Sequence, residues 1–101
     1  MFVVTNRITV APENAEAFEQ TFGSSMRENL AGVAGLHRAT LLRPESDGLP
    51  YVSTMEFDSK ADFMAWMRSD SFRASHSDAD ANRLAAQSAV EQHTLIEVVP
   101  A

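Results

Sequence analysis

Cysteine is absent from the 101 residues of this chain, which excludes disulfide bonds, zinc–thiolate centres and thiol nucleophiles. Lysine is almost absent too: Lys60 is the single one, and the arginines are scattered along the sequence. Acidic side chains outnumber basic ones by 14 to 8, which gives a formal charge of −6. Because nucleic acids and anionic membranes are bound by clustered lysine and arginine, the composition predicts no nucleic-acid partner and no membrane partner.

Long apolar runs are also missing. The apolar stretch at the N-terminus is far too short for a signal peptide or a membrane span, so we expect a cytoplasmic protein. No linker, low-complexity tract or charge block interrupts the chain, which predicts one domain over residues 1–101. A core of this size is adequate but small, so burial of a further face in an oligomer would add stability.

The first half of the sequence predicts a strand followed by a helix. Residues 2–10 are rich in β-branched side chains that alternate with polar ones, as in a half-buried strand. Pro12 suits the first turn of a helix, and apolar residues then recur at helical spacing as far as Leu30. The glycines at 32 and 35 end this helix.

The second half predicts a hairpin, two short helices and a last strand. Residues 36–43 and 51–57 read as strands joined by a turn that is rich in proline, glycine and acidic residues. Ser59 and Ser69 each begin a short helix, the first through a capping box with Asp62. The polar segment 77–89 has no boundary that the sequence defines, and residues 90–99 read as the final strand.

This βαββαβ order predicts an α+β fold of the ferredoxin-like type, an antiparallel sheet with helices on one face. The opposite face carries Val3 and, on the predicted last strand, Leu95 and Val99, while the other phase of that strand is apolar as well. Apolar residues in both phases predict that both sheet faces are covered. A second copy of the sheet is the simplest cover, so we expect a homodimer.

Three side chains stand out against this fold. Asn6 falls on the inward face of the first strand, among Val4 and Ile8, where an amide without a partner costs about 1–3 kcal/mol. Trp66 and His76 lie ten residues apart, across the break between the two short helices. Each has a structural explanation: a satisfied amide, a core indole and a hydrogen-bonded core imidazole. Together over one apolar pocket they favour a flat, iron-bearing ligand rather than hydrolysis.

The segment from Phe57 to His76, FDSKADFMAWMRSDSFRASH, resembles the antibiotic biosynthesis monooxygenase superfamily. The likeness of fold extends from Val3 to Val99, and the superfamily forms dimeric α+β barrels. Asn6, Trp66 and His76 match one by one the catalytic trio of its haem-degrading, IsdG-like branch. The resemblance implies that His76 is the axial ligand of haem iron. It implies that the amide of Asn6 donates a hydrogen bond on the opposite face of the haem.

In the same resemblance Trp66 presses the macrocycle out of plane, which is a recognised influence on haem electronics. Apolar side chains complete the expected haem pocket: Phe22, Met26 and Met67. Haem would be both substrate and cofactor, with molecular oxygen and electrons from a reductase or a small-molecule reductant. His37 and His93 lack comparable surroundings and are predicted to lie on the surface.

Two other functions stay open at this point. One is a cofactor-free monooxygenase of the same superfamily that oxidises a polycyclic phenol or quinol, a reaction that needs no histidine ligand. The other is a haem-binding or carrier protein without turnover, which would use the same pocket.

Overall fold

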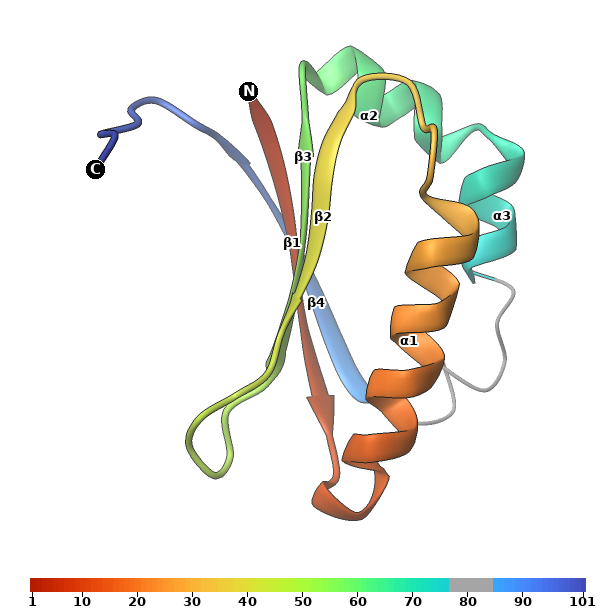
Figure 1. Ribbon diagram of the computed structural model, residues 1–101, viewed down its shortest axis with the longest axis vertical. Helices are drawn as coiled ribbons and strands as arrows, with labels where there is room; N and C mark the ends of the chain where they lie inside the picture. The colour runs from red at the N-terminus through yellow and green to blue at the C-terminus, as the bar shows by residue number, and fades with distance from the viewer. Residues whose placement is uncertain (77–84) are drawn as a thin grey trace.

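Four antiparallel strands form one sheet, and helices cover one of its faces (Figure 1). In this computed structural model, residues 1–76 and 85–101 are described, with side chains for 1–74 and 88–101. In chain order the elements are β1 Phe2–Val10, η1 Pro12–Asn14, α1 Ala15–Asn29, β2 Leu36–Leu42, β3 Tyr51–Phe57, α2 Lys60–Met67, α3 Asp70–His76 and β4 Ala85–Thr94. The strand order β2-β3-β1-β4 confirms the predicted ferredoxin-like arrangement.

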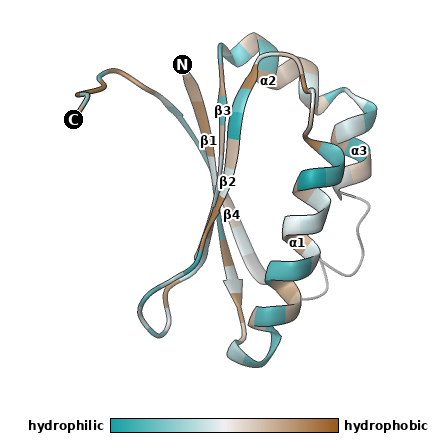
Figure 2. Ribbon diagram, viewed as in Figure 1, coloured by the Kyte–Doolittle hydropathy of each residue, from teal (hydrophilic) through white to brown (hydrophobic). Residues whose placement is uncertain are grey.

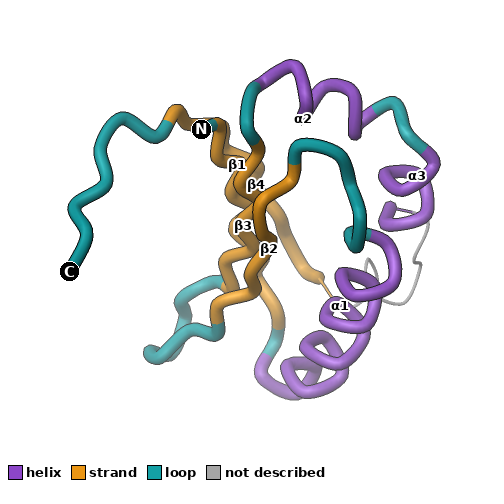
Figure 3. Tube along the Cα trace, turned by 45° about the horizontal axis from the view of Figure 1, so that its top comes forward, coloured by secondary structure: helices purple, strands orange, loops and turns teal. Residues whose placement is uncertain are grey.

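The predicted start signals of the two short helices are confirmed. Ser59 precedes α2, and its hydroxyl oxygen accepts a hydrogen bond from the backbone N–H of Asp62 at 3.2 Å. Ser69 does the same for α3, accepting from the N–H of Phe72 at 3.2 Å. Each serine satisfies an N–H group that has no partner within its helix. The chain therefore breaks between α2 and α3, and α3 turns back toward α1 (Figures 1 and 3).

The prediction of the last strand over 90–99 was wrong at both ends, because β4 spans Ala85–Thr94. The length of β1 explains both limits. Its far end, Val10, still pairs with Ala85 across a register shift, so β4 begins early. Its first residue, Phe2, pairs with Thr94, and the N–H of Leu95 makes a last hydrogen bond to the carbonyl of Met1. Beyond that point β1 offers no further backbone to pair with.

Residues 95–101 consequently leave the sheet, and Leu95 and Val99 do not contribute to its outer face as expected. Figure 1 shows this tail extending away from the helical side, and Figure 2 shows hydrophobic residues along it. Ile96 is 91% exposed and Val99 is 82% exposed. The apolar residues that were expected on the outer sheet face thus lie exposed in the tail instead.

The outer face of the sheet itself is more polar than the sequence predicted. Arg7 and Glu91 form an ion pair across β1 and β4, with 2.7 Å between Nε and Oε1. Arg38 and Glu56 form another across β2 and β3. In the part of the chain that is described, no helix packs over this face (Figure 3).

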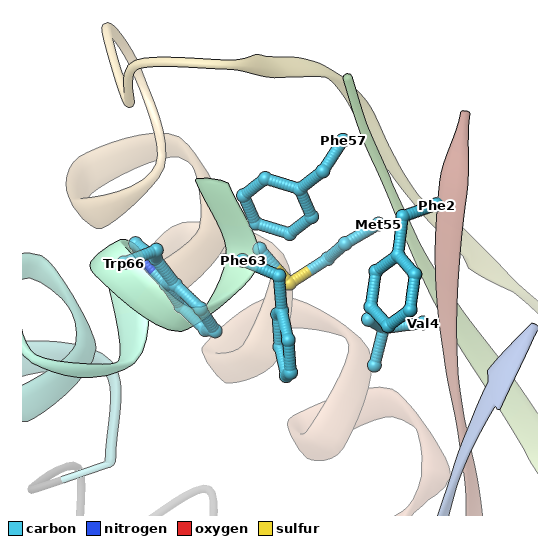
Figure 4. Packing of buried hydrophobic residues seen from close by; sticks show 6 residues of the cluster. All are labelled: Phe2, Val4, Met55, Phe57, Phe63 and Trp66. Atoms are coloured by element: carbon cyan, nitrogen blue, oxygen red, sulfur yellow. The ribbon is translucent and has the colours of Figure 1, made fainter. Parts of the chain in front are cut away.

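Two separate hydrophobic clusters lie between the inner face and the helices. One gathers six buried side chains near the start of β1 (Figure 4): Phe2, Val4, Met55, Phe57, Phe63 and Trp66. The other, near the end of β1, is built from Ile8, Phe18 and Tyr51. Asn6 and its cross-strand partner Ser53 lie between the two clusters. Along β1 and β3 the inner face is thus apolar at both ends and polar at the pair in between.

Candidate active site

A cavity of about 440 Å³ opens over that polar pair. Its floor comes from β1, β3 and β4, and its walls come from α1, α2 and α3. The lining residues are mostly apolar: Val4, Asn6, Ile8, Phe18, Phe22, Ser25, Met26, Leu30, Ser53, Met55, Phe63, Trp66, Met67, Phe72, Ser88, Val90 and Gln92. Its described lining contains amide and hydroxyl groups but no carboxylate or cationic side chain. An apolar enclosure with a few polar groups is typical of a site for a largely apolar small molecule.

Asn6 lies in the floor of the cavity, as its phase along β1 predicts. Its Oδ1 atom is shut off from solvent and has no hydrogen-bond partner among the described residues. A buried acceptor left in this condition costs about 1–3 kcal/mol, and most buried polar atoms in proteins avoid it. The described residues thus give no support to a satisfied amide oxygen as the structural explanation of Asn6. Orphaned polar atoms of this kind are expected where a side chain serves a ligand.

The polar neighbours of Asn6 in the cavity floor were not predicted from the sequence. Ser53 pairs directly with Asn6 across β1 and β3. On β4, Ser88 and Gln92 pair with Ile8 and Val4, so both lie diagonally from Asn6. The signal for Ser53 was present, because it shares the inward phase of β3 with buried side chains at 51, 55 and 57. On β4 the wrong strand boundaries obscured the same signal.

Trp66 is both a core residue and part of the cavity wall. Its side chain is 7% exposed and belongs to the larger hydrophobic cluster. Its indole Nε1–H donates to Ser71 Oγ at 3.1 Å, and its ring lies edge-on to Phe72 with 5.0 Å between the centroids. Trp66 is thus a core side chain and a pocket side chain at the same time. The rigid ring forms a fixed wall.

His76 is the last residue of α3, and its side chain lies outside the described part of the structure. Phe72 lies four positions earlier on the same helix and lines the cavity. Residues four apart lie on one face of a helix, so α3 presents position 76 on the face that carries Phe72. The structure thus describes Asn6 and Trp66 at the cavity, and the backbone of His76 one helical turn after Phe72 on α3.

The remaining residues named in the sequence analysis fall into two groups, those that line the cavity and those on the surface. Phe22, Met26 and Met67 all line the cavity, as expected for an apolar wall. His37 and His93 are both exposed, which confirms their predicted surface location. His37 donates a hydrogen bond from Nε2 to the carboxylate of Asp58, well away from the cavity lining.

A charged cluster beside the cavity attaches the start of α1 to the hairpin strands. The guanidinium of Arg43 donates two hydrogen bonds to Glu19, at 2.8 and 2.6 Å, and the hydroxyl of Tyr51 donates a third at 2.5 Å. These bonds, with Arg43 the larger cause, lower the pKa of Glu19 to about 2. Burial, and then the Glu19 carboxylate, raise the pKa of Tyr51. Since Tyr51 packs against Phe18 at 5.0 Å, this cluster fixes one end of the cavity wall.

Two absences concern the residues that the structure describes. They contain no group of three or more histidine, cysteine or carboxylate side chains placed to hold a metal ion. They also contain no helix with the length and apolar composition that crossing a membrane requires.

Comparison with known proteins agrees with the resemblance in the sequence. Residues 1–78 match the family model described as antibiotic biosynthesis monooxygenase. A curated relative from Staphylococcus haemolyticus, named heme oxygenase (staphylobilin-producing), is 36% identical over 81 residues, covering 79% of this chain and 77% of that protein.

Solved structures share the fold over almost the whole chain. The heme-degrader MhuD from Mycobacterium tuberculosis, with two hemes bound in its active site, has a TM-score of 0.83 at 22% identity and covers 99% of this chain and 100% of its own. A mutant of SnoaB, a cofactor-independent oxygenase from Streptomyces nogalater, has a TM-score of 0.79 at 24% identity, with 99% and 97% covered. The chain therefore belongs to the antibiotic biosynthesis monooxygenase family, and within it to the IsdG-like branch that its sequence motif indicates.

Proposed function

We propose that this chain is a haem-degrading monooxygenase that binds haem through His76, opens the porphyrin ring oxidatively and releases iron. The curated relative, named a heme oxygenase, supports this substrate class. The observation that carries the proposal is an apolar cavity of about 440 Å³ with one orphaned amide oxygen in its floor. Haem fits that combination, because its ring is apolar and its polar chemistry is concentrated at the iron and the propionates.

The residues around the cavity suit separate tasks toward such a ligand. Phe22, Met26 and Met67 would contact the apolar ring. The amide of Asn6 lies in the cavity floor, where its NH₂ group would donate a hydrogen bond to a polar partner at the ring centre. Its Oδ1 atom has no partner among the described residues and would be free to accept one. His76, one turn after Phe72, would bind the iron with a neutral imidazole. Trp66 would press on one side of the ring as a rigid wall.

Haem, when bound, supplies the iron that activates molecular oxygen and is also the molecule that is consumed. The electrons come from outside the chain, from a reductase or a small-molecule reductant. What this chain contributes is binding, orientation and the exclusion of bulk water from a mostly apolar pocket. Asn6 contributes the polar contact and Trp66 the steric one.

A cofactor-free oxidation of a polycyclic phenol or quinol is the second candidate. The fold shared with a cofactor-independent oxygenase favours it, and the same cavity would accept a flat aromatic substrate. This reaction assigns no role to His76. The third candidate, a haem carrier without turnover, differs from the first only in that the bound haem is never opened.

One experiment separates the three candidates. Haemin is titrated into the purified protein while the Soret region is monitored, and ascorbate is then added in air. We expect a new Soret band that bleaches as an opened tetrapyrrole appears. A stable band that never bleaches would favour the carrier. No band, together with oxygen uptake on addition of a polycyclic quinol, would favour the cofactor-free enzyme.

We also infer that the protein assembles as a homodimer through the outer face of the sheet and the C-terminal tail. In the described part of the chain no helix packs over that face (Figure 3), and the tail beside it exposes Ile96 and Val99. Burying these side chains against a second copy would remove them from water. Symmetric pairing of identical surfaces is the commonest route to such burial.

A further inference from the structure

A single hydroxyl group connects the one tryptophan of the chain to the end of α1. The indole Nε1–H of Trp66 donates to Ser71 Oγ at 3.1 Å, and the Ser71 hydroxyl in turn donates to the backbone carbonyl of Asn29. Asn29 is the last residue of α1, where carbonyl groups have no partner within the helix. Ser71 lies in the first turn of α3. The hydrogen bonds therefore join α2, α3 and α1 at one point.

Other contacts hold the backbone and the ring of Trp66, among them the rings of Phe57, Phe63 and Phe72. The Phe72 ring meets the Trp66 ring at 88°, with 5.0 Å between centroids. The Ser69 hydroxyl donates to the backbone carbonyl of Trp66 at 2.5 Å. The ring contacts hold the indole by packing, whereas a hydrogen bond to Nε1 is directional. The χ2 torsion of tryptophan is broad and roughly two-fold. The directional bond from Nε1 to Ser71 favours the orientation in which the N–H faces that hydroxyl.

We propose that Ser71 is a positioning residue for Trp66, fixing the plane of the indole where it borders the cavity. Ser71 does not line the cavity, so it acts on a ligand through Trp66 and not directly. The effect of Ser71 on catalysis rests on the proposed function, in which the orientation of the Trp66 ring determines how far a flat ligand is distorted. Its effect on the indole itself does not depend on that function.

The orientation can be measured without any ligand, because Trp66 is the only tryptophan. A ¹⁵N-labelled sample gives one indole N–H signal, and its hydrogen exchange reports the bond to Ser71. We expect exchange in Ser71→Ala to be faster by roughly tenfold, as the loss of one typical hydrogen bond implies. Ser71→Thr retains a hydroxyl and should restore slow exchange. Ser24→Ala, a serine on α1 that does not line the cavity, should leave the signal unchanged.

A haem-loaded arm tests the consequence. With equal haem affinity, Ser71→Ala should degrade haem more slowly and yield a broader mixture of ring-opening isomers, and Ser71→Thr should restore the wild-type product pattern. Equal indole exchange in wild type and Ser71→Ala overturns the proposal, whatever haem does. Faster exchange with unchanged rate and products overturns the catalytic consequence. Faster exchange in a protein that never degrades haem supports the positioning role and rejects the proposed function. If Ser71→Ala fails to fold, Ser71→Cys, a weaker donor of similar size, should show intermediate exchange.

Discussion

Asn6 and Ser53 lie directly opposite each other on β1 and β3, and both face the cavity. Their pairing places two polar side chains between the two hydrophobic clusters that pack against this sheet face. The Oδ1 atom of Asn6 remains without a partner among the described residues despite this neighbour. The unpartnered oxygen is unfavourable for folding but suited to binding a ligand. A substitution at Asn6 should therefore change stability and activity in opposite directions.

Replacing Asn6 with valine should improve folding and impair activity at once. Valine removes the orphaned oxygen and is favoured in strands, so the free energy of unfolding should rise by about 1 kcal/mol. Haem should still give a Soret band, but turnover should fall about a hundredfold, the usual loss for one well-placed donor. Urea titration and haem loss under ascorbate measure the two effects. A variant that is more stable and fully active would remove Asn6 from the mechanism.

The three histidines offer a matched test of the iron ligand. His76→Ala should abolish or greatly weaken ferric haem binding and shift the absorption spectrum, because imidazole is the proposed axial ligand. His37→Ala and His93→Ala change exposed side chains and should leave the spectrum unaltered. Circular dichroism checks that each variant is folded. Unchanged spectra in all three variants would make His76 structural and favour the cofactor-free enzyme.

Glu19 predicts a specific loss of stability in acid. Its pKa is lowered from 4.5 to about 2 in the folded protein, chiefly by Arg43, so the unfolded chain binds the proton more readily. The stabilisation is therefore present above pH 4.5 and is lost as the pH falls through the folded pKa near 2. Glu19→Gln should be less stable at neutral pH and show a shallower decline over this interval. Chemical denaturation at a series of pH values measures the slopes, and parallel curves would contradict the prediction.

Two glycines with the same backbone conformation test the contact between the α1–β2 turn and α2. Gly32 and Gly35 have φ of 77° and 78°, so alanine is strained at either position by about 1–2 kcal/mol. At Gly35 a Cβ atom would also lie 2.4 Å from Cγ of Asp62, in the capping box of α2, whereas at Gly32 it would meet nothing within 4 Å. Thermal unfolding should show Gly35→Ala to be clearly the less stable variant. Equal melting temperatures would mean that Asp62 moves aside freely.

The homodimer can be tested by sedimentation of the full chain and of a variant lacking residues 95–101. We expect the full chain to sediment with twice the chain mass at micromolar concentration. The shortened variant should dissociate more readily, because it loses the exposed Ile96 and Val99. A full-length monomer would contradict the proposed assembly.

Local sequence signals predicted most of the fold. The alternation in β1 and β3 gave both strands their correct bounds, and Ser59 and Ser69 located both short helices through hydrogen bonds made within one turn. The prediction of the last strand failed because its limits depend on a partner that is distant in sequence. β4 ends opposite the first residue of β1, at the pair of Phe2 and Thr94. No pattern within residues 85–99 contains that information.

The candidate site was predicted on the same terms. Asn6 stood out because a single strand shows which of its residues face inward, whereas the apolar wall of Phe22, Met26 and Met67 was expected from the family resemblance. Ser71 was missed, although it lies within the same motif, because Ser69 accounts for the start of this helix and no local pattern marks Ser71. Its actual partners, Trp66 and Asn29, come from two other helices. Such contacts arise only from the packing of elements.

The separation of the two hydrophobic clusters determines which part of the cavity floor can change without disturbing the core. Each cluster packs within itself, near opposite ends of β1, and neither requires the side chains at positions 6 and 53. Substitutions along this middle row should therefore cost the fold little stability. The same scaffold underlies a heme degrader and a cofactor-independent oxygenase. Changes in the middle row would therefore alter the floor of the cavity while both clusters stay in place.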